Sequence, residues 1–499
     1  MKSISELTQK KPALAWLLFF VTIAIVFLLG LLASSIIERR AEALFVNTPK
    51  TAISDGEVRN EIWGENYPRE FQSYYGTADT TFRSKHGGNA TVDMLEEIPE
   101  LVVLWAGYAF SRDYKQGRGH FYAIEDINNT LRTAAPMTPD GGIQPTTCWT
   151  CKSPDVPRMM KEEGITQYYT GMWARLGPEI VNPIGCADCH DAKSANLHIS
   201  RPALIEAFER QGKDVTKASY QEMRTLVCAQ CHVEYYFNKK VAEGASYLTF
   251  PWDKGMTVEA MEEYYDEYGF TDWTHKLSKA PMLKAQHPDY ELFQLGPHAQ
   301  RGLSCADCHM PYKTDGAIKY SDHQLVSPIM NIDRTCQSCH RDSKENLMKY
   351  VYEYQDKALE IRNRVETELS KAHIGAKYAW DNGANEKQME PVLKLLRSAQ
   401  WRWDFAVASH GASFHAPVET QRILAHSLDK SYQAQLEIQK VLSAIGVKGE
   451  FPMPDISTKA KAQEYIGLDM KTLHANKDKF KSEIIPQWVA KAKENKRLL

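Results

Sequence analysis

The chain has 499 residues, of which 43% are hydrophobic and 25% are charged, and its formal net charge is −3. This composition is that of an ordinary globular protein, without a low-complexity tract or a block of like charge. The nearly balanced charge gives no sign of a nucleic-acid-binding surface, so we expect no nucleic acid among its partners.

The N-terminal segment, residues 1–44, is predicted to direct the chain to a membrane. Residues 13–37 are almost continuously apolar, with Lys10 and Lys11 before them and Arg39 and Arg40 after them. About 20 apolar residues span a bilayer, whereas the apolar core of a signal peptide usually has about 7–15. An uncleaved anchor is therefore slightly favoured over a cleaved signal peptide. Both place the chain after about residue 40 outside the cytoplasm.

All ten cysteines occur in pairs with two residues between them, and four of the five pairs are followed directly by a histidine. These four motifs are Cys186–Cys189–His190, Cys228–Cys231–His232, Cys305–Cys308–His309 and Cys336–Cys339–His340. This pattern attaches haem c, with two thioether bonds to the porphyrin and the histidine placed to bind the iron. Disulfides and zinc sites also use paired cysteines, but neither needs a histidine after each pair.

The fifth pair, Cys148 and Cys151, is followed by Lys152 in place of histidine. Taken alone, it is explained as well by a degenerate motif or a disulfide as by a haem site. Beside four haem motifs, a fifth haem with a lysine ligand is the better interpretation. A lysine amine can bind iron only in its neutral form, which burial and the metal both favour. This exception marks the haem where chemistry is expected.

Sixteen histidines are present, and four of them follow the cysteine pairs. Haems that only transfer electrons usually have two protein ligands, so four such haems need four further histidines. A catalytic haem needs one side open for its substrate. Because twelve histidines remain, counting alone does not assign the ligands.

The haem motifs all lie within residues 45–340, a region rich in turns, aromatics and prolines with little regular strand pattern. After residue 340, apolar residues recur at three- and four-residue steps, which predicts helices. The three stripes are Leu347, Val351, Tyr354, Ala358, Ile361, Val365 and Leu369; Met389, Val392, Leu396, Ala399, Trp403 and Ala406; and Leu424, Leu428, Tyr432 and Leu436. Residues 383–385 and 415–417 break these helices.

We therefore predict a mainly α, multihaem cytochrome c fold, in which haems pack the core. Its pentahaem region is residues 45–340, and residues 341–499 form long helices. The apolar stripes of these helices pack either within the chain or on a second subunit.

The order of the motifs resembles that of the ammonia-forming cytochrome c nitrite reductases over about residues 60–445. Further matching strings are Arg112-Asp-Tyr114, Arg118-Gly-His120, Leu131-Arg-Thr133, Val233-Glu-Tyr-Tyr236, Lys284-Ala-Gln-His287 and Trp401-Arg-Trp-Asp404. The resemblance implies reduction of nitrite to ammonium with six electrons and eight protons, on five haems c.

The same resemblance implies that Lys152 is the proximal ligand of the catalytic haem and that Arg132, Tyr235 and His287 line its open side. These residue types suit the chemistry. Arg132 is permanently charged and can hold an anion, while His287 can deliver protons near neutral pH. Tyr235 supplies a hydroxyl that can donate or relay a proton.

Distal ligands are also implied by the resemblance. They are His86 for the haem at Cys228, His298 for the haem at Cys336, His323 for the haem at Cys186 and His415 for the haem at Cys305. His410 continues the apolar stripe of the second long helix, so it is interpreted as a structural residue and His415 as the ligand.

A calcium ion near the catalytic haem is implied as well. Glu234, the backbone of Tyr235, the backbone of Lys284 and the side chain of Gln286 would supply its oxygen ligands, the kind that a hard cation prefers. Such an ion adds positive field near an anionic substrate.

The implied partners are nitrite, an electron donor and a second copy of the chain. The donor is a membrane-bound quinol-oxidising multihaem cytochrome or a small multihaem cytochrome, and the homodimer forms through the long C-terminal helices. The implied location is the periplasm, with a tether to the inner membrane if residues 13–37 are retained. Two other functions stay open: an electron carrier with all haems saturated, and a related enzyme acting mainly on hydroxylamine or sulfite.

Overall fold

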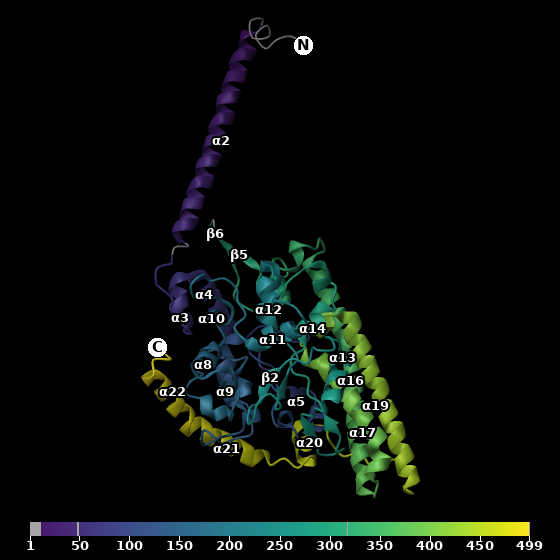
Figure 1. The fold of residues 1–499 in the computed structure, drawn as a ribbon. Coiled ribbons are helices and arrows are strands. Elements are labelled where there is room, and N and C mark those ends of the chain that lie inside the picture. Colours follow the sequence, from purple (N-terminus) through teal and green to yellow (C-terminus); the bar gives the residue numbers. More distant parts are fainter. Residues whose placement is uncertain (1–10, 47–48, 317, 499) are drawn as a thin grey trace.

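The computed structural model describes residues 11–46, 49–316 and 318–498, so residues 1–10 of the predicted N-terminal segment lie outside the described residues. Helix α2 (Pro12–Val46) projects away from the rest of the protein (Figure 1). Its apolar part, Pro12–Arg40, is 29 residues long, and none of its most apolar stretch is buried inside the protein. A signal peptide and a membrane anchor both fit this helix.

The region that carries the cysteine motifs consists of short helices joined by turns. The helices are α3 (Asn60–Asn66), α4 (Pro68–Tyr75), α5 (Met94–Glu97), α6 (Glu100–Leu104), α7 (Ala123–Asn129), α8 (Asp155–Glu163), α9 (Ile165–Tyr168), α10 (Cys186–Cys189), α11 (Pro202–Arg210), α12 (Tyr220–Ala229), α13 (Val258–Tyr268), α14 (Asp289–Gln294) and α15 (Cys305–His309). Among the described residues, the strands form only two-stranded antiparallel hairpins. These are β1 (Tyr236–Asn238) with β2 (Tyr247–Thr249), β3 (Trp273–Thr274) with β4 (Pro281–Met282), and β5 (Tyr312–Asp315) with β6 (Ile318–Ser321).

Three long helices follow, and Figure 1 shows them running side by side. They are α16 (Lys344–Asp381), α17 (Glu386–Ala408) and α19 (Pro417–Ala444), with the short α18 (Ala412–His415) before α19. The two predicted breaks are confirmed. Asn385 caps α17 through its side chain, and α19 begins at a proline, whose missing N–H costs nothing at that position. Because α17 ends at Ala408, His410 does not continue its apolar stripe and is exposed.

The long helices share one hydrophobic core with the cysteine-motif region. Trp105 after α6 packs on Trp403 of α17, with ring centroids 5.5 Å apart. A buried ion pair between Lys284 and Asp404, at 2.8 Å, joins the same two parts. The predicted mainly α fold is confirmed, with the long helices packed along one side of the motif region.

The C-terminal segment returns to the motif region after the long helices. Its helices are α20 (Lys459–Tyr465), α21 (Met470–Glu483) and α22 (Ile485–Glu494). In Figure 1, α20 and α21 run along the lower edge of the motif region and α22 rises beside α8 and α9, so that the chain ends near α3. We call residues 459–498 the C-terminal strap. Trp488 of the strap packs edge-on against Trp173, which belongs to the surroundings of the Lys152 motif.

Candidate active site

The five cysteine motifs lie close together in space. All ten cysteines are free in this structure. The neighbouring Cys231 thiol lowers the pKa of Cys151, and the neighbouring Cys228 thiol lowers the pKa of Cys305. The motif at residues 228–232 therefore contacts both the Lys152 motif and the motif at residues 305–309.

The two remaining motifs each lie beside one of these three motifs. Burial raises the pKa of Cys189 to about 12, and Asp188 and Cys231 add to the rise. Burial also raises the pKa of Cys308 to about 12, with a further contribution from Cys336. These neighbours place the motif at 186–190 beside the motif at 228–232, and the motif at 336–340 beside the motif at 305–309.

Each histidine that follows a cysteine pair faces a second histidine. The ring centroids are 6.1 Å apart for His190 and His323, 6.5 Å for His120 and His232, 6.3 Å for His309 and His415, and 6.4 Å for His298 and His340. One metal ion fits between two rings at this separation, since metal–imidazole bonds are about 2.0 Å long in zinc proteins. By contrast, His275 and His373 stack directly at 3.8 Å, which leaves no such space.

The orientation of these rings also fits a metal. The Nδ1–H groups of His190, His309 and His323 donate to the backbone carbonyls of Ala195, Val326 and Ser321. His232 Nδ1 lies 3.3 Å from Asp289 Oδ2. A carbonyl can only accept, so Nδ1 carries the proton in the neutral ring and the other nitrogen is the one that can bind a metal, as in many metalloproteins. The donor set therefore fits haem iron with two histidine ligands.

The structure corrects one predicted pairing, because His120 and not His86 faces His232. His86 lies in a bend of the chain beside α16, where its Nε2–H donates to Asp356 Oδ1 of that helix at 2.5 Å, so the nitrogen that would bind iron is already occupied. His120 follows Gly119, whose φ of +96° turns the chain so that the ring faces His232. The string Arg118-Gly-His120 holds this signal in the sequence.

Lys152 ends a motif that is fixed by tryptophan stacking. Trp149 is fully buried, lies parallel to Trp173 at a centroid distance of 4.9 Å, and donates from Nε1 to the Trp173 carbonyl. The Lys152 N–H donates to the Trp149 carbonyl at 2.8 Å. These contacts fix the backbone of the motif up to Lys152.

Arg132 lies in a tight turn, Leu131–Thr133, near the Lys152 motif. Burial raises the pKa of the Cys148 thiol to about 12, and the positive charges of Lys152 and Arg132 oppose this rise. The Arg132 guanidinium lies over the Phe110 ring at 4.5 Å, and its Nε donates to Thr130 Oγ1. Among the described residues its two terminal nitrogens donate to no protein group, so they are free to hold an anion.

Tyr235 and His287 lie together on the same side, with ring centroids 6.4 Å apart. Burial raises the pKa of Tyr235 well above its ordinary value, and the sulfurs of Cys151 and Cys148 are the next causes. Burial lowers the pKa of His287 well below its ordinary value, and Lys152 is the next cause. The structure therefore brings Arg132, Tyr235 and His287 close to the Lys152 motif, and their catalytic roles stay a prediction.

A cluster of buried acids lies behind Tyr235. Glu234 is fully buried and accepts from the Tyr265 hydroxyl at 2.9 Å and from the Gln286 N–H at 2.6 Å. Burial raises its pKa well above the ordinary value, with Glu291 and Asp272 contributing. Burial likewise raises the pKa of Asp272 to about 7 and that of Glu291 to about 8.

This cluster fits a divalent cation. Buried carboxylates so close together are costly unless a positive charge compensates them. The Gln286 side chain lies 3.2 Å from the Lys284 carbonyl, and turning its amide over would present two oxygens to the same place. Among the described residues, however, three or more His, Cys, Asp or Glu side chains are nowhere arranged as a metal site by themselves. Backbone and amide oxygens are therefore needed to complete the ligand set.

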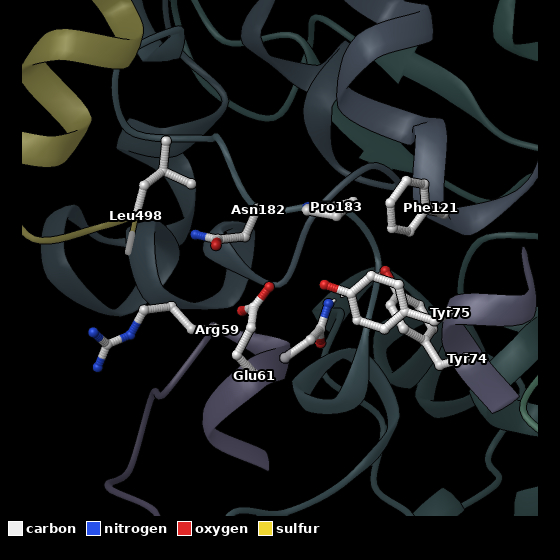
Figure 2. A pocket seen from close by; sticks show the side chains of 9 residues that line it. Arg59, Glu61, Tyr74, Tyr75, Phe121, Asn182, Pro183 and Leu498 are labelled. Carbon is white, nitrogen blue, oxygen red and sulfur yellow. Dashed lines mark hydrogen bonds between the residues drawn. The ribbon is translucent and has the colours of Figure 1, made fainter. Parts of the chain in front are cut away.

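A separate pocket of about 200 Å³ lies away from Lys152 (Figure 2). Tyr74, Tyr75 and Phe121 form one side of it, and Arg59 and Glu61 of the α3 region form another. Asn60, which also lines it, accepts from the Cys186 N–H at 2.9 Å. The pocket thus borders the motif at residues 186–190 and not the candidate active site.

Comparison with known proteins identifies the family. The cytochrome c552 family model matches residues 59–496. Cytochrome c-552 of Parabacteroides distasonis is 64% identical over 484 residues, which cover 97% of each chain. Cytochrome c-552 of Desulfotalea psychrophila is 48% identical over 478 residues, covering 94% of this chain and 92% of that one.

A solved structure, the cytochrome c nitrite reductase of Desulfovibrio desulfuricans, superposes with a TM-score of 0.73 at 30% identity. The match covers 85% of this chain and 91% of that one, whose catalytic subunit has two calcium sites. The motif series, the facing histidines and these matches agree, and the chain belongs to the cytochrome c552 family of c-type cytochromes.

Proposed function

We propose that this chain is a pentahaem nitrite reductase that forms ammonium: NO₂⁻ + 6 e⁻ + 8 H⁺ → NH₄⁺ + 2 H₂O. The observation that carries the proposal is the single Cys-x-x-Cys motif ending in Lys152, faced by Arg132, Tyr235 and His287. The relative of known structure is named for the same activity.

The side chains around Lys152 suit each part of this reaction. Haem iron held by Lys152 would supply the electrons and a site for the nitrogen of nitrite. Arg132 holds the anion and stabilises charge on its oxygens through a preorganised, permanently charged donor. His287 and Tyr235 supply protons to the oxygens that leave as water. Because its pKa is lowered, His287 is neutral at pH 7 and can both accept a proton and pass it on.

The four histidine pairs are proposed as ligands of four haems that carry electrons. The pairs are His190 with His323, His232 with His120, His309 with His415, and His340 with His298. Two imidazole ligands keep the iron saturated in both redox states, which favours electron transfer over substrate binding. Asp289 fixes the ring of His232, and Ser409 donates to Asp289 at 2.6 Å.

Calcium is proposed to bind at Glu234, the Tyr235 and Lys284 carbonyls and the Gln286 side chain. The buried acids around Glu234 support this proposal, as does the description of calcium in the relative of known structure. The ion would hold Tyr235 and the Lys284–His287 segment in place, since both flank its ligands.

The enzyme is proposed to work in the periplasm, with α2 as a membrane anchor, and to receive electrons from a quinol-oxidising multihaem cytochrome or a small multihaem cytochrome. A homodimer through the long helices is supported by apolar side chains that α16 and α19 leave exposed. They are Tyr350, Tyr354, Val418, Tyr432 and Leu436, and Leu436 is 63% exposed.

The decisive experiment supplies nitrite and a reduced dye and measures the dye oxidised per ammonium formed. We expect six electrons per ammonium, and nitric oxide as the final product would overturn the proposal. A spectroscopic count of high-spin haem tests the alternative of a pure electron carrier, because only the Lys152 haem is expected to be high-spin. If all five haems are low-spin, the carrier is the correct function.

A further inference from the structure

The C-terminal strap reaches the active site through one buried lysine. Lys477 of α21 is only 3% exposed, although its neighbours in the helix face solvent. Its amine donates to the Asn128 carbonyl and to Thr133 Oγ1, both at 3.1 Å. Thr133 is the residue after Arg132. The strap therefore touches the turn that carries the predicted anion-binding side chain.

This turn is held on both sides by polar contacts. Asp113 Oδ2 accepts from Thr130 Oγ1 and from the Leu131 N–H, each at 3.0 Å. Thr130 Oγ1 in turn accepts from Arg132 Nε at 3.2 Å. Asp113 thus fixes the start of the turn, and Lys477 fixes its end at Thr133.

The turn needs such support because it ends in a strained residue. Ala134 has φ of 55° and ψ of −151°, a conformation that residues other than glycine rarely adopt. Strained residues of this kind persist only where the surrounding structure holds them, and they cluster at functional sites. Lys477 makes its contacts immediately before this residue.

We propose that Lys477 is a positioning residue for nitrite binding: it fixes the Leu131–Thr133 turn so that Arg132 points at the substrate anion. This inference rests on the proposed function and adds to it the part of the chain that determines specificity for an anion. Lys477 itself does not touch the substrate.

The chemistry of the contact agrees with this role. Burial lowers the pKa of Lys477 to about 7, while Asp113 opposes the shift. A neutral amine still has two N–H donors, which match the two acceptors Asn128 O and Thr133 Oγ1. The contact therefore holds the turn whether or not the lysine is charged.

The test compares an anionic with a neutral substrate in the holoenzyme. Lys477→Met keeps most of the side-chain volume and removes both donors, so the KM for nitrite is expected to rise about tenfold, as for a lost buried hydrogen bond. The KM for hydroxylamine, which is neutral above pH 7 and needs no anion site, is expected to change by less than about twofold. Lys479→Met, on the exposed side of the same helix, is the matched control and should leave both values unchanged.

Thr133→Val repeats the test from the other partner of the contact and serves if Lys477→Met yields no holoenzyme. Adding Lys477→Met to Thr133→Val should raise the KM for nitrite little further, because the two changes remove the same contact. Equal changes for both substrates, or none, would overturn the positioning role. If the wild type fails to consume six electrons per ammonium, the proposed function fails instead, so the two failures are distinguishable.

Discussion

The four histidine-ended motifs and the single lysine-ended motif are built on different plans. At the four, a histidine stands on each side of the expected iron, and at three of them the Nδ1 of the motif histidine is fixed by a backbone carbonyl or by Asp289. At Lys152, the opposite side has three chemically different side chains, which come from separate turns of the chain. Electron transfer requires a protein ligand on both sides of the iron, whereas catalysis requires one open side that is lined by groups able to hold an anion and move protons. The two kinds of motif differ in the residue that follows the cysteine pair, histidine or lysine.

The largest effect should follow from removing the proton donor. His287→Ala should lower nitrite turnover by about 10²-fold or more, the usual contribution of a positioned general acid. Haem content, measured by pyridine haemochrome, should stay at five per chain because His287 follows no cysteine pair. His86→Ala is the matched control, since His86 only bonds Asp356 at the surface. Unchanged nitrite turnover in fully haemylated His287→Ala would show that His287 is not the proton donor at the Lys152 haem.

Removal of calcium should have the next largest effect. Dialysis against a chelator should lower nitrite turnover about tenfold, in the range seen when support for a metal site is lost, and added calcium should restore it. Glu234→Gln should already be low in activity and should no longer respond to the chelator. Full activity after verified loss of calcium, measured by atomic emission, would show that the buried acids are compensated in another way.

A smaller, spectroscopic effect should identify the partner of His232. His120→Ala should convert one haem of the four paired sites from low-spin to high-spin, because its iron loses an imidazole. His86→Ala should leave the spectrum unchanged. The opposite result for the two variants would restore the pairing that was first predicted from the sequence.

The smallest effect concerns the pH dependence of stability. The pKa of Lys477 is lowered to about 7 in the folded state, against about 10.4 in an unfolded chain. Between these values the unfolded state binds the extra proton, so this residue makes the free energy of unfolding rise with pH. Below pH 7 its penalty is constant. Melting temperatures of the wild type should therefore rise relative to those of Lys477→Met from pH 7 to pH 10, by a few degrees. Asp113, which opposes the shift, and Lys481, which adds to it, stay unchanged in both proteins.

The sequence predicts best what depends on local chemistry. The spacing of the cysteines, the apolar stripes of α16, α17 and α19 and the break at Asn385 were all readable, because each depends on residues a few positions apart. The partner of His232 was missed, although the string Arg118-Gly-His120 was among the matching strings, because neither His86 nor His120 follows a cysteine pair and only the folded chain shows which ring faces His232. The contact of Lys477 with Thr133 could not be predicted either, because the two residues are 344 positions apart along the chain.

The contacts between the cysteine motifs form a branched network, with residues 228–232 as its junction. In such a network, an electron arriving on either arm reaches the branch point and is then one step from Lys152. With haems bound as proposed, each arm would hold single electrons near the Lys152 motif between substrate encounters. Five haems would together store up to five electrons, so fewer of the six that the reaction consumes would have to arrive from the donor while nitrite is bound.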